Sequence, residues 1–377
     1  MFSLMMQWIF INALVLICVV TITGFIIPQI LLIAFRKNLF DKPDPRKIHT
    51  SEVPRLGGIA FFPAILFALL LLLGIGLMSN DADLIHRLFK HVLPLCFIGC
   101  ATVLLYLTGM ADDLVGVKYR AKFAMQTISA AMLIIGGLRI ENLHGFLGIY
   151  NLPFVISVLL TAVLIIFIIN AINLIDGLDG LASGLSGVAC GFYVYVFMSN
   201  ELYTYSALAV ATLGSLLPFF AFNVFGDARK HRKIFMGDTG ALIIGLYLSV
   251  MSIVACSIPQ THSGENPAII AFAPLLIPGF DVVRVYLHRL RAHRNPFLPD
   301  KTHIHHKLLA AGLSQRKAMI TIVASSIVLI LINYFLSSSV NITVLFFSNL
   351  AFWIIINTCL THAIHRRENK LGCKLYD

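Results

Sequence analysis

Long apolar segments alternate with short polar ones along the whole chain. A membrane-spanning helix needs roughly 20 predominantly apolar residues, and about eleven segments approach or exceed that length. The expected spans cover residues 7–34, 57–77, 88–108, 122–138, 153–172, 181–198, 203–224, 239–256, 267–287, 318–337 and 342–364. The connections are mostly brief and show no repeat. The pattern predicts an all-α polytopic membrane bundle that forms one domain over residues 1–377.

The composition agrees with a bilayer as the main solvent. Of the 377 residues, 58% are hydrophobic and only 12% are charged, whereas soluble domains carry about 25% charged residues. The net charge of +10 is typical of cytoplasmic loops that lie near anionic lipid headgroups. We therefore expect membrane lipids, and no nucleic acid, among the partners of the protein.

The basic residues predict the orientation of the bundle. All but three of the 28 Lys and Arg residues lie in or at the edges of the odd-numbered gaps between spans, or in the segment after the last span, the exceptions being Arg87, Lys90 and Arg139. Basic residues concentrate on the cytoplasmic side of membrane proteins. This asymmetry predicts an N-terminus outside, a C-terminus in the cytoplasm, and a multi-pass protein with an odd number of spans.

Acidic residues gather at the ends of the spans on the predicted cytoplasmic side. They are Asp112, Asp113, Asp176, Asp179 and Asp238. An aspartate at the centre of a bilayer costs roughly 3 kcal/mol, so acids beside apolar helices need partners. Solvated pairs with nearby Lys and Arg would explain one such residue. Three separate acidic motifs on one face favour a functional site instead.

The motif Asn-x-x-Asn-x-x-Asp-Gly-x-Asp-Gly covers residues 170–180. If this segment is helical, Asn170, Asn173 and Asp176 lie on one face, with Asp179 continuing the spacing. The glycines allow close approach of a ligand to the backbone. Amide and carboxylate oxygens suit Mg²⁺ or Mn²⁺ better than zinc. The motif therefore predicts a site for a hard divalent cation with acids left over for other tasks.

Two further acidic motifs are weaker when each is taken alone. Asp112 and Asp113 are neighbours, which point about 100° apart on a helix, so we expect one to face reacting groups and the other to anchor a basic side chain. The segment Phe-Met-Gly-Asp-Thr-Gly, at residues 235–240, is commonly a turn and helix cap. Its Asp238 gains meaning from the other acids on the same side.

Two basic loops complete the polar face. Residues 288–317 form a long basic loop that contains His303, His305 and His306; loops of this length are functional or disordered, and histidines beside lysines suggest recognition of anions. The loop at 41–58 contains Arg46, Lys47 and His49. Binding of phosphates and binding of lipid headgroups are equally compatible with that second loop.

The order of these motifs resembles that of the polyprenyl-phosphate N-acetylhexosamine-1-phosphate transferases. The motifs are Arg-Lys-x-His, Val-Pro-x-x-Gly-Gly, Asp-Asp, Asn-x-x-Asn-x-x-Asp-Gly-x-Asp-Gly, Phe-Met-Gly-Asp and His-x-His-His, between about residues 36 and 317. The resemblance implies an enzyme of the bacterial inner membrane that works at the cytoplasmic face with Mg²⁺ or Mn²⁺. A UDP-linked N-acetylamino sugar would donate sugar-1-phosphate to undecaprenyl phosphate and release UMP. Direct attack and a covalent intermediate both remain open.

The resemblance also implies roles for individual residues. Asn173 and Asp238 would bind the metal, and Asp112 would deprotonate the lipid phosphate or attack in its stead. Asp113, Asp176 and Asp179 correspond to essential acids, with Asp179 close to the nucleotide. The expected substrate-binding residues are Arg46, Lys47, His49, Arg120, Lys122, Asn223, Phe235, His303, His305 and His306. The stretch from 226 to 233 lengthens the connection between Asn223 and Phe235 relative to the muropeptide enzymes.

The residues present in two of the motifs favour one branch of this family. Three consecutive histidines and Thr-Pro-Thr-Met-Gly-Gly are usual in the muropeptide translocases, whereas this chain has His-Ile-His-His and Val-Pro-Arg-Leu-Gly-Gly. The expected donor is UDP-N-acetylglucosamine or a close epimer, used to begin a cell-surface polysaccharide. A muropeptide transferase is the alternative within the enzyme class, and a secondary transporter, with polar residues at mid-membrane, is the alternative outside it. The oligomeric state stays open, a homodimer being one candidate.

Overall fold

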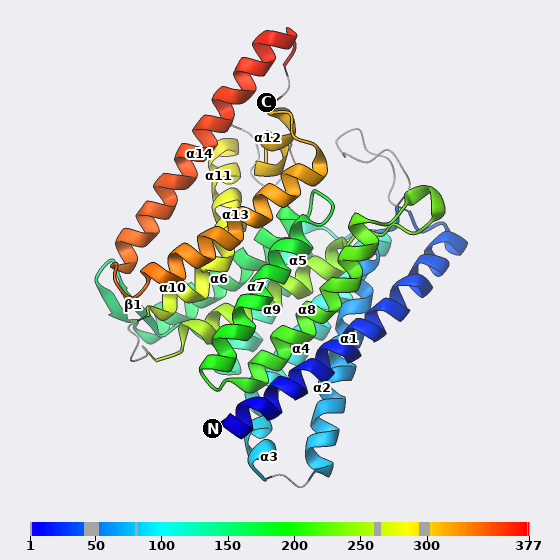
Figure 1. Cartoon of the computed structure of the whole chain (residues 1–377), viewed down its shortest axis with the longest axis vertical. Helices are drawn as coiled ribbons and strands as arrows, with labels where there is room; N and C mark the ends of the chain where they lie inside the picture. Colours follow the sequence, from blue (N-terminus) through cyan, green and yellow to red (C-terminus); the bar gives the residue numbers. More distant parts are fainter. Residues whose placement is uncertain are drawn as a thin grey trace.

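A computed structural model describes residues 2–40, 53–79, 82–259, 265–293, 302–374 and 376. Within these ranges the protein is a bundle of long helices, with one small hairpin (Figure 1). The helices that form most of the bundle are α1 (Phe2–Lys37), α2 (Phe61–Met78), α4 (Val92–Val115), α5 (Tyr119–Ile135), α6 (Phe154–Ile175), α7 (Leu181–Ser199), α8 (Tyr203–Val224), α9 (Gly237–Cys256), α11 (Leu276–Arg291), α13 (Gln315–Leu336) and α14 (Ile342–Leu371). The shorter elements are η1 (Gly57–Ala60), α3 (Ala82–Phe89), β1 (Asn142–Phe146), β2 (Ile149–Asn151), η2 (Ala228–Lys230), α10 (Pro267–Phe272), η3 (Ala273–Leu275) and α12 (Ile304–Ala310).

The predicted spans match helices of this bundle. In the described part of the chain, ten helices are long and apolar enough to cross a membrane. One of these ten, Pro267–Arg291, consists of the consecutive elements α10, η3 and α11. The remaining predicted span, 122–138, corresponds to α5, which has 17 residues and a length of about 26 Å. That length is at the short end of the range for spanning helices. With α5 included, the described helices provide eleven candidate crossings, and the two ends of the chain lie at opposite ends of the bundle (Figure 1).

Helix α9 forms the centre of the protein. All of its residues are buried, and it packs against α4, α6 and α10. Two close approaches depend on glycine: a Cβ added at Gly109 would lie 2.5 Å from the Cα of Thr239, and one at Gly245 would lie 2.6 Å from the Cα of Ile169. Small residues at helix contacts are the usual means of tight packing in membranes. They bring α4, which carries Asp112 and Asp113, and α6, which carries Asn170 and Asn173, against α9.

The outer surface of the bundle suits lipid rather than water. Large apolar side chains on the outer helices are more than half exposed, including Phe25, Leu70 and Val163. An exposed apolar surface of this extent is unfavourable in water but not in a bilayer. Helices α1 and α14 lie on opposite flanks (Figure 1), while the antiparallel hairpin pairs Phe146 with Ile149. The fold is therefore the predicted all-α membrane bundle.

Candidate active site

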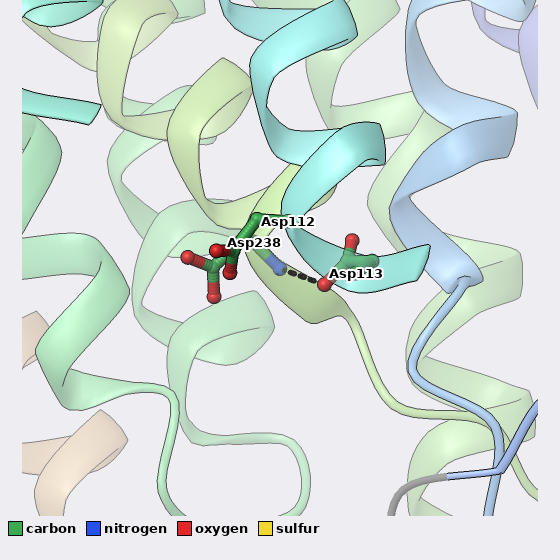
Figure 2. Close-up of side chains that lie close together, drawn as sticks. All are labelled: Asp112, Asp113 and Asp238. Carbon is green, nitrogen blue, oxygen red and sulfur yellow. Dashed lines mark hydrogen bonds between the residues drawn. The ribbon is translucent and has the colours of Figure 1, made fainter. Parts of the chain in front are cut away.

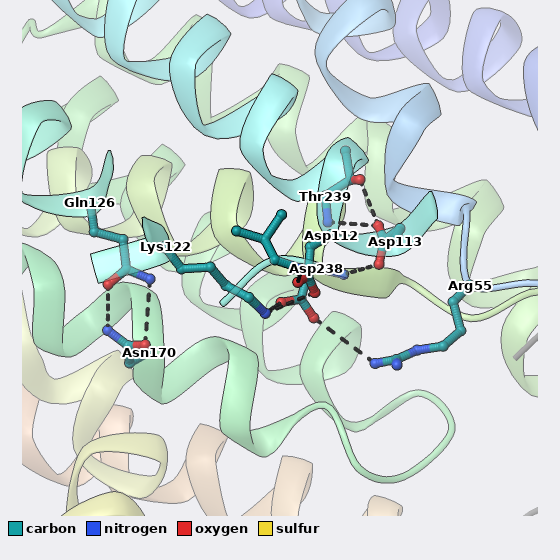
Figure 3. A network of polar contacts seen from close by, with 9 residues as sticks. Arg55, Asp112, Asp113, Lys122, Gln126, Asn170, Asp238 and Thr239 are labelled. Carbon is teal, nitrogen blue, oxygen red and sulfur yellow. Dashed lines mark hydrogen bonds and ion pairs between the residues drawn. The ribbon is translucent and has the colours of Figure 1, made fainter. Parts of the chain in front are cut away.

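Asp113 caps the N-terminus of the central helix α9. Its carboxylate accepts a hydrogen bond from the backbone N–H of Asp238 at 2.8 Å (Figure 2). It also accepts the N–H of Thr239 at 2.9 Å and the Thr239 hydroxyl at 2.6 Å (Figure 3). The first N–H groups of a helix have no partner within the helix, and an anion is favourable there. Asp113 therefore joins the end of α4 to the start of α9 and sets Asp238 beside Asp112.

Asp112 and Asp238 share one lysine. The Lys122 ammonium lies 2.8 Å from Asp112 and 2.5 Å from Asp238, and the Arg55 guanidinium lies 3.9 Å from Asp238 (Figure 3). A second oxygen of Asp112 accepts the backbone N–H of Val117 at 2.7 Å. The two neighbouring aspartates do have different partners, as expected. However, it is Asp112 that pairs with a basic side chain, whereas Asp113 binds a helix terminus.

The acidic cluster fits a hard cation. Asp112, Asp113 and Asp238 can each offer one oxygen with all three oxygens within 4.8 Å of one another. The ammonium of Lys122 already lies between two of these carboxylates, so the position attracts positive charge. Asn173 lines the same cavity as Asp238 and adds an amide oxygen of the kind that Mg²⁺ accepts. Because Asp113 is engaged by three hydrogen bonds, Asp112, Asp238 and Asn173 are the better-placed donors.

A cavity of about 390 Å³ lies beside these acids. Its polar wall includes Lys122, Asn173, Asp238 and Arg289, and its apolar wall comes largely from α5, α6 and α11. The apolar wall reaches Val163, whose side chain is 65% exposed on the outside of the bundle. The cavity thus joins a charged centre to a surface suited to lipid, an arrangement that an amphiphilic phosphate would match.

The loop between α6 and α7 carries the other two acids. Helix α6 ends at Ile175, so the helical spacing holds for Asn170 and Asn173 but not for Asp176 and Asp179. Asn170 exchanges hydrogen bonds with Gln126, of which the shorter is 2.8 Å (Figure 3). Burial raises the pKa of Asp176 to about 7, although the positive charge of Arg55 opposes the shift. Asp176 can therefore hold a proton near neutral pH.

Asn223 holds this loop in place. Its side-chain oxygen accepts the N–H of Gly180 at 2.6 Å, and its side-chain nitrogen donates to the carbonyl of Ile234 at 2.9 Å. Both ends of the amide are thus engaged by backbone. Next to it, Lys233 pairs with Asp179 and lies over the ring of Phe235, 5.9 Å from the ring centroid. Lys233 is a candidate site residue that the motifs did not reveal.

Two sequence motifs come together through the backbone. Phe235 donates its N–H to the carbonyl of Pro54 at 2.8 Å, Gly57 donates to Phe235 at 2.9 Å, and Gly58 donates to Met236 at 2.8 Å. The Val-Pro-x-x-Gly-Gly segment therefore supports Phe-Met-Gly-Asp. The other predicted residues of the first loop, Arg46, Lys47 and His49, lie outside the described residues. Arg120 is exposed, and its guanidinium lies against the ring of Tyr119.

The histidine motif reaches the acidic loop from α12. The ring of His305 is buried, and its nitrogens make no hydrogen bond to the residues that the structure describes. A Cβ added at Gly177 would lie 2.6 Å from Nε2 of His305, so the imidazole contacts the loop between Asp176 and Asp179. Burial, and then the neighbouring His306 and His303, lower the pKa of His305. A neutral imidazole in this position can donate one hydrogen bond from its N–H to an anionic group of a substrate. Its other nitrogen can accept a hydrogen bond, for example from a hydroxyl group.

Asp281 anchors this motif and was not predicted. Its carboxylate is fully buried on α11, 2.8 Å from Nδ1 of His303 and 2.8 Å from the Arg284 guanidinium. It also accepts the backbone N–H of Ile304 at 3.0 Å. An acid inside an apolar span is a functional candidate by default, and that signal was present in the sequence.

The protein is thus a polytopic membrane bundle with a cluster of three aspartates that could hold a cation, beside a cavity with a largely apolar wall. The family model for glycosyl transferase family 4 matches residues 95–256. The decaprenyl-phosphate N-acetylglucosaminephosphotransferase of Mycolicibacterium smegmatis is 33% identical over 322 residues, covering 80% of this chain and 76% of that protein. The undecaprenyl-phosphate alpha-N-acetylglucosaminyl 1-phosphate transferase of Yersinia pestis is 30% identical over 304 residues, covering 80% and 77%. The chain therefore belongs to the polyprenyl-phosphate N-acetylhexosamine-1-phosphate transferases and is an enzyme of that family.

Proposed function

We propose that the enzyme transfers N-acetylglucosamine-1-phosphate, or a close epimer, from the UDP-sugar to undecaprenyl phosphate at the cytoplasmic face of the inner membrane. An oxygen of the lipid phosphate attacks the sugar-bearing phosphorus, the bond between the two phosphates of the donor breaks, and UMP leaves. The product is a lipid-linked sugar diphosphate that begins a cell-surface polysaccharide. The observation that carries this proposal is the acidic cluster placed beside a cavity with an apolar, lipid-facing wall.

The residues divide into an acceptor side and a donor side. On the acceptor side, Asp112 removes a proton from the lipid phosphate or attacks in its stead, and Lys122 balances the phosphate charge at the polar end of the cavity. On the donor side, Asp179 and Phe235 contact the nucleotide, and His305 faces the sugar phosphate. Both substrates are anionic, so positioning and electrostatic stabilisation supply most of the catalysis.

Asp238 and Asn173 would hold Mg²⁺ or Mn²⁺. A bound divalent cation would neutralise charge on the donor diphosphate and on the leaving UMP. The rest of the mechanism belongs to the side chains: Asp113 fixes the position of Asp238, and Asn223 fixes the loop that carries Asp179.

The proposal is tested with purified protein, undecaprenyl phosphate and a panel of UDP-sugars. We expect UMP release with UDP-N-acetylglucosamine or a close epimer, and loss of turnover in Asp238→Asn. Asp227→Asn is a matched control, because Asp227 is an exposed acid in the loop between α8 and α9. Exclusive use of UDP-N-acetylmuramoyl-pentapeptide would move the enzyme to the muropeptide branch. No UMP release with any donor would refute the proposed reaction.

A further inference from the structure

The seven-residue helix α12 carries His305 and His306 but is too short to fix its own orientation. Isolated helices shorter than about 12–15 residues are marginal, so neighbouring elements must hold it. On one flank, α11 does so through Asp281, which binds His303 and the backbone of Ile304. Arg284, also on α11, donates to the carbonyl of Thr302. These contacts hold only the start of α12.

Helix α14 holds the opposite flank. The Lys307 ammonium donates to the Thr361 hydroxyl at 3.0 Å and to the carbonyl of Asn357 at 3.3 Å. Arg367 donates to the carbonyl of Ala310 at 2.9 Å, at the end of α12. With 30 residues, α14 spans about 45 Å, which lets its last turns reach beyond the apolar part and lie beside the histidine motif.

The chain then turns back toward the motif. Gly372 has a left-handed backbone conformation, with φ of 65°, and ends α14. Tyr376 donates its N–H to the Glu368 carboxylate at 3.1 Å and its hydroxyl to the carbonyl of Thr302 at 2.6 Å. The Lys307 ammonium lies 5.7 Å from the centroid of the Tyr376 ring. Tyr376 thus contacts residues on both sides of His303 and His305.

We propose that Tyr376 is a positioning residue that holds α12 so that His305 faces the loop between Asp176 and Asp179. The proposal rests on the proposed function, because the histidine motif is taken to contact the donor. It assigns a catalytic consequence to the segment after α14, which is 74 residues away from Thr302 in the sequence. Tyr376 acts through Thr302 and Lys307 and touches no reacting group.

The test compares Tyr376→Phe, which keeps the ring over Lys307 but loses the hydroxyl, with Tyr376→Ala, which loses both. Loss of one hydrogen bond predicts a kcat about three- to tenfold lower in Tyr376→Phe, a larger loss in Tyr376→Ala, and an unchanged KM for undecaprenyl phosphate. In a His305→Ala background, Tyr376→Phe should have little further effect, because both changes act on one unit. Tyr150→Phe, an exposed tyrosine of the hairpin, is the matched control.

Hydrogen exchange of residues 302–310 gives a readout that does not depend on activity. We expect faster exchange there in both Tyr376 variants, with α7 unchanged. Wild-type kcat and wild-type exchange in Tyr376→Ala would overturn the proposal, as would an equal loss of kcat in the presence and absence of His305. If the wild-type enzyme accepts none of the UDP-sugars, the proposed function fails. Exchange then still decides whether Tyr376 holds α12.

Discussion

The same substitution should affect different properties at the two adjacent aspartates. Asp113→Asn should lower the stability of the protein, whereas Asp112→Asn should abolish turnover. Asp113→Asn replaces an acceptor-only carboxylate with an amide that can accept at one atom only. It therefore keeps at most part of the three hydrogen bonds to Asp238 and Thr239. Hydrogen bonds to charged groups are worth about 1.5–3 kcal/mol each, and the charge at a helix N-terminus adds about 0.3–2 kcal/mol. We expect a loss of about 3 kcal/mol in the stability of the folded protein.

Asp112→Asn should leave stability nearly unchanged. The amide oxygen can still accept the N–H of Val117, and Lys122 keeps Asp238 as its partner. The assay is thermal unfolding of each purified variant in one detergent, together with UMP release. Asp113→Asn should lower the unfolding midpoint by roughly 5 °C or more, whereas Asp112→Asn should abolish turnover at a near-wild-type midpoint. Equal midpoints for the two variants, or an inactive Asp113→Asn with a wild-type midpoint, would refute the distinction between a helix cap and a reactive acid.

Four further predictions follow from the site and the fold. Asp238→Ala should abolish turnover in a protein that still folds and inserts, and chelation with EDTA should stop the wild-type enzyme; full activity in EDTA would exclude a metal-dependent mechanism. Because the pKa of Asp176 is raised to about 7, its protonated form favours the folded state below pH 4 and this stabilisation is lost as the pH rises to about 7. In EDTA, the unfolding midpoint should fall less between pH 4 and pH 7 in Asp176→Asn than in the wild-type protein. An equal fall in both proteins would contradict the raised pKa of Asp176. His305→Ala should lower kcat about 10²-fold, since a positioned hydrogen-bond donor to developing charge is worth on the order of 3 kcal/mol. A loss of kcat below threefold would show that His305 does not act as such a donor. Reporters fused at Lys370 and inserted at Gly148 should lie on the cytoplasmic and periplasmic sides respectively, and the same side for both would refute the odd number of spans expected between these two positions.

The spans could be predicted because their signal is local. An apolar run of helical length is sufficient to define each one, and the predicted span 153–172 corresponds to α6 at Phe154–Ile175. Even the short predicted span at 181–198 is a helix, Leu181–Ser199. The hairpin of β1 and β2 was not predicted, because its polar residues between two spans carry no clear periodicity.

The site could be predicted only in part, since its partners are distant in sequence. The motifs indicated Asp112, Asp113 and Asp238, but not that Asp113 would bind the backbone of α9, 125 residues away. The roles of Asp281 and Lys233 depend on contacts with other elements that no local spacing reveals. The amide of Asn223 looked available for a substrate, whereas the fold directs it to two backbone groups.

In the proposed reaction the enzyme moves a sugar together with its phosphate. Donor labelled with ³²P at the sugar-bearing phosphate tests this most directly, when incubated with the purified enzyme and undecaprenyl phosphate. We expect the label to enter the lipid product, unlabelled UMP to be released, and Asp112→Asn to prevent both. Label retained in released UDP, with an unlabelled sugar on the lipid, would contradict it.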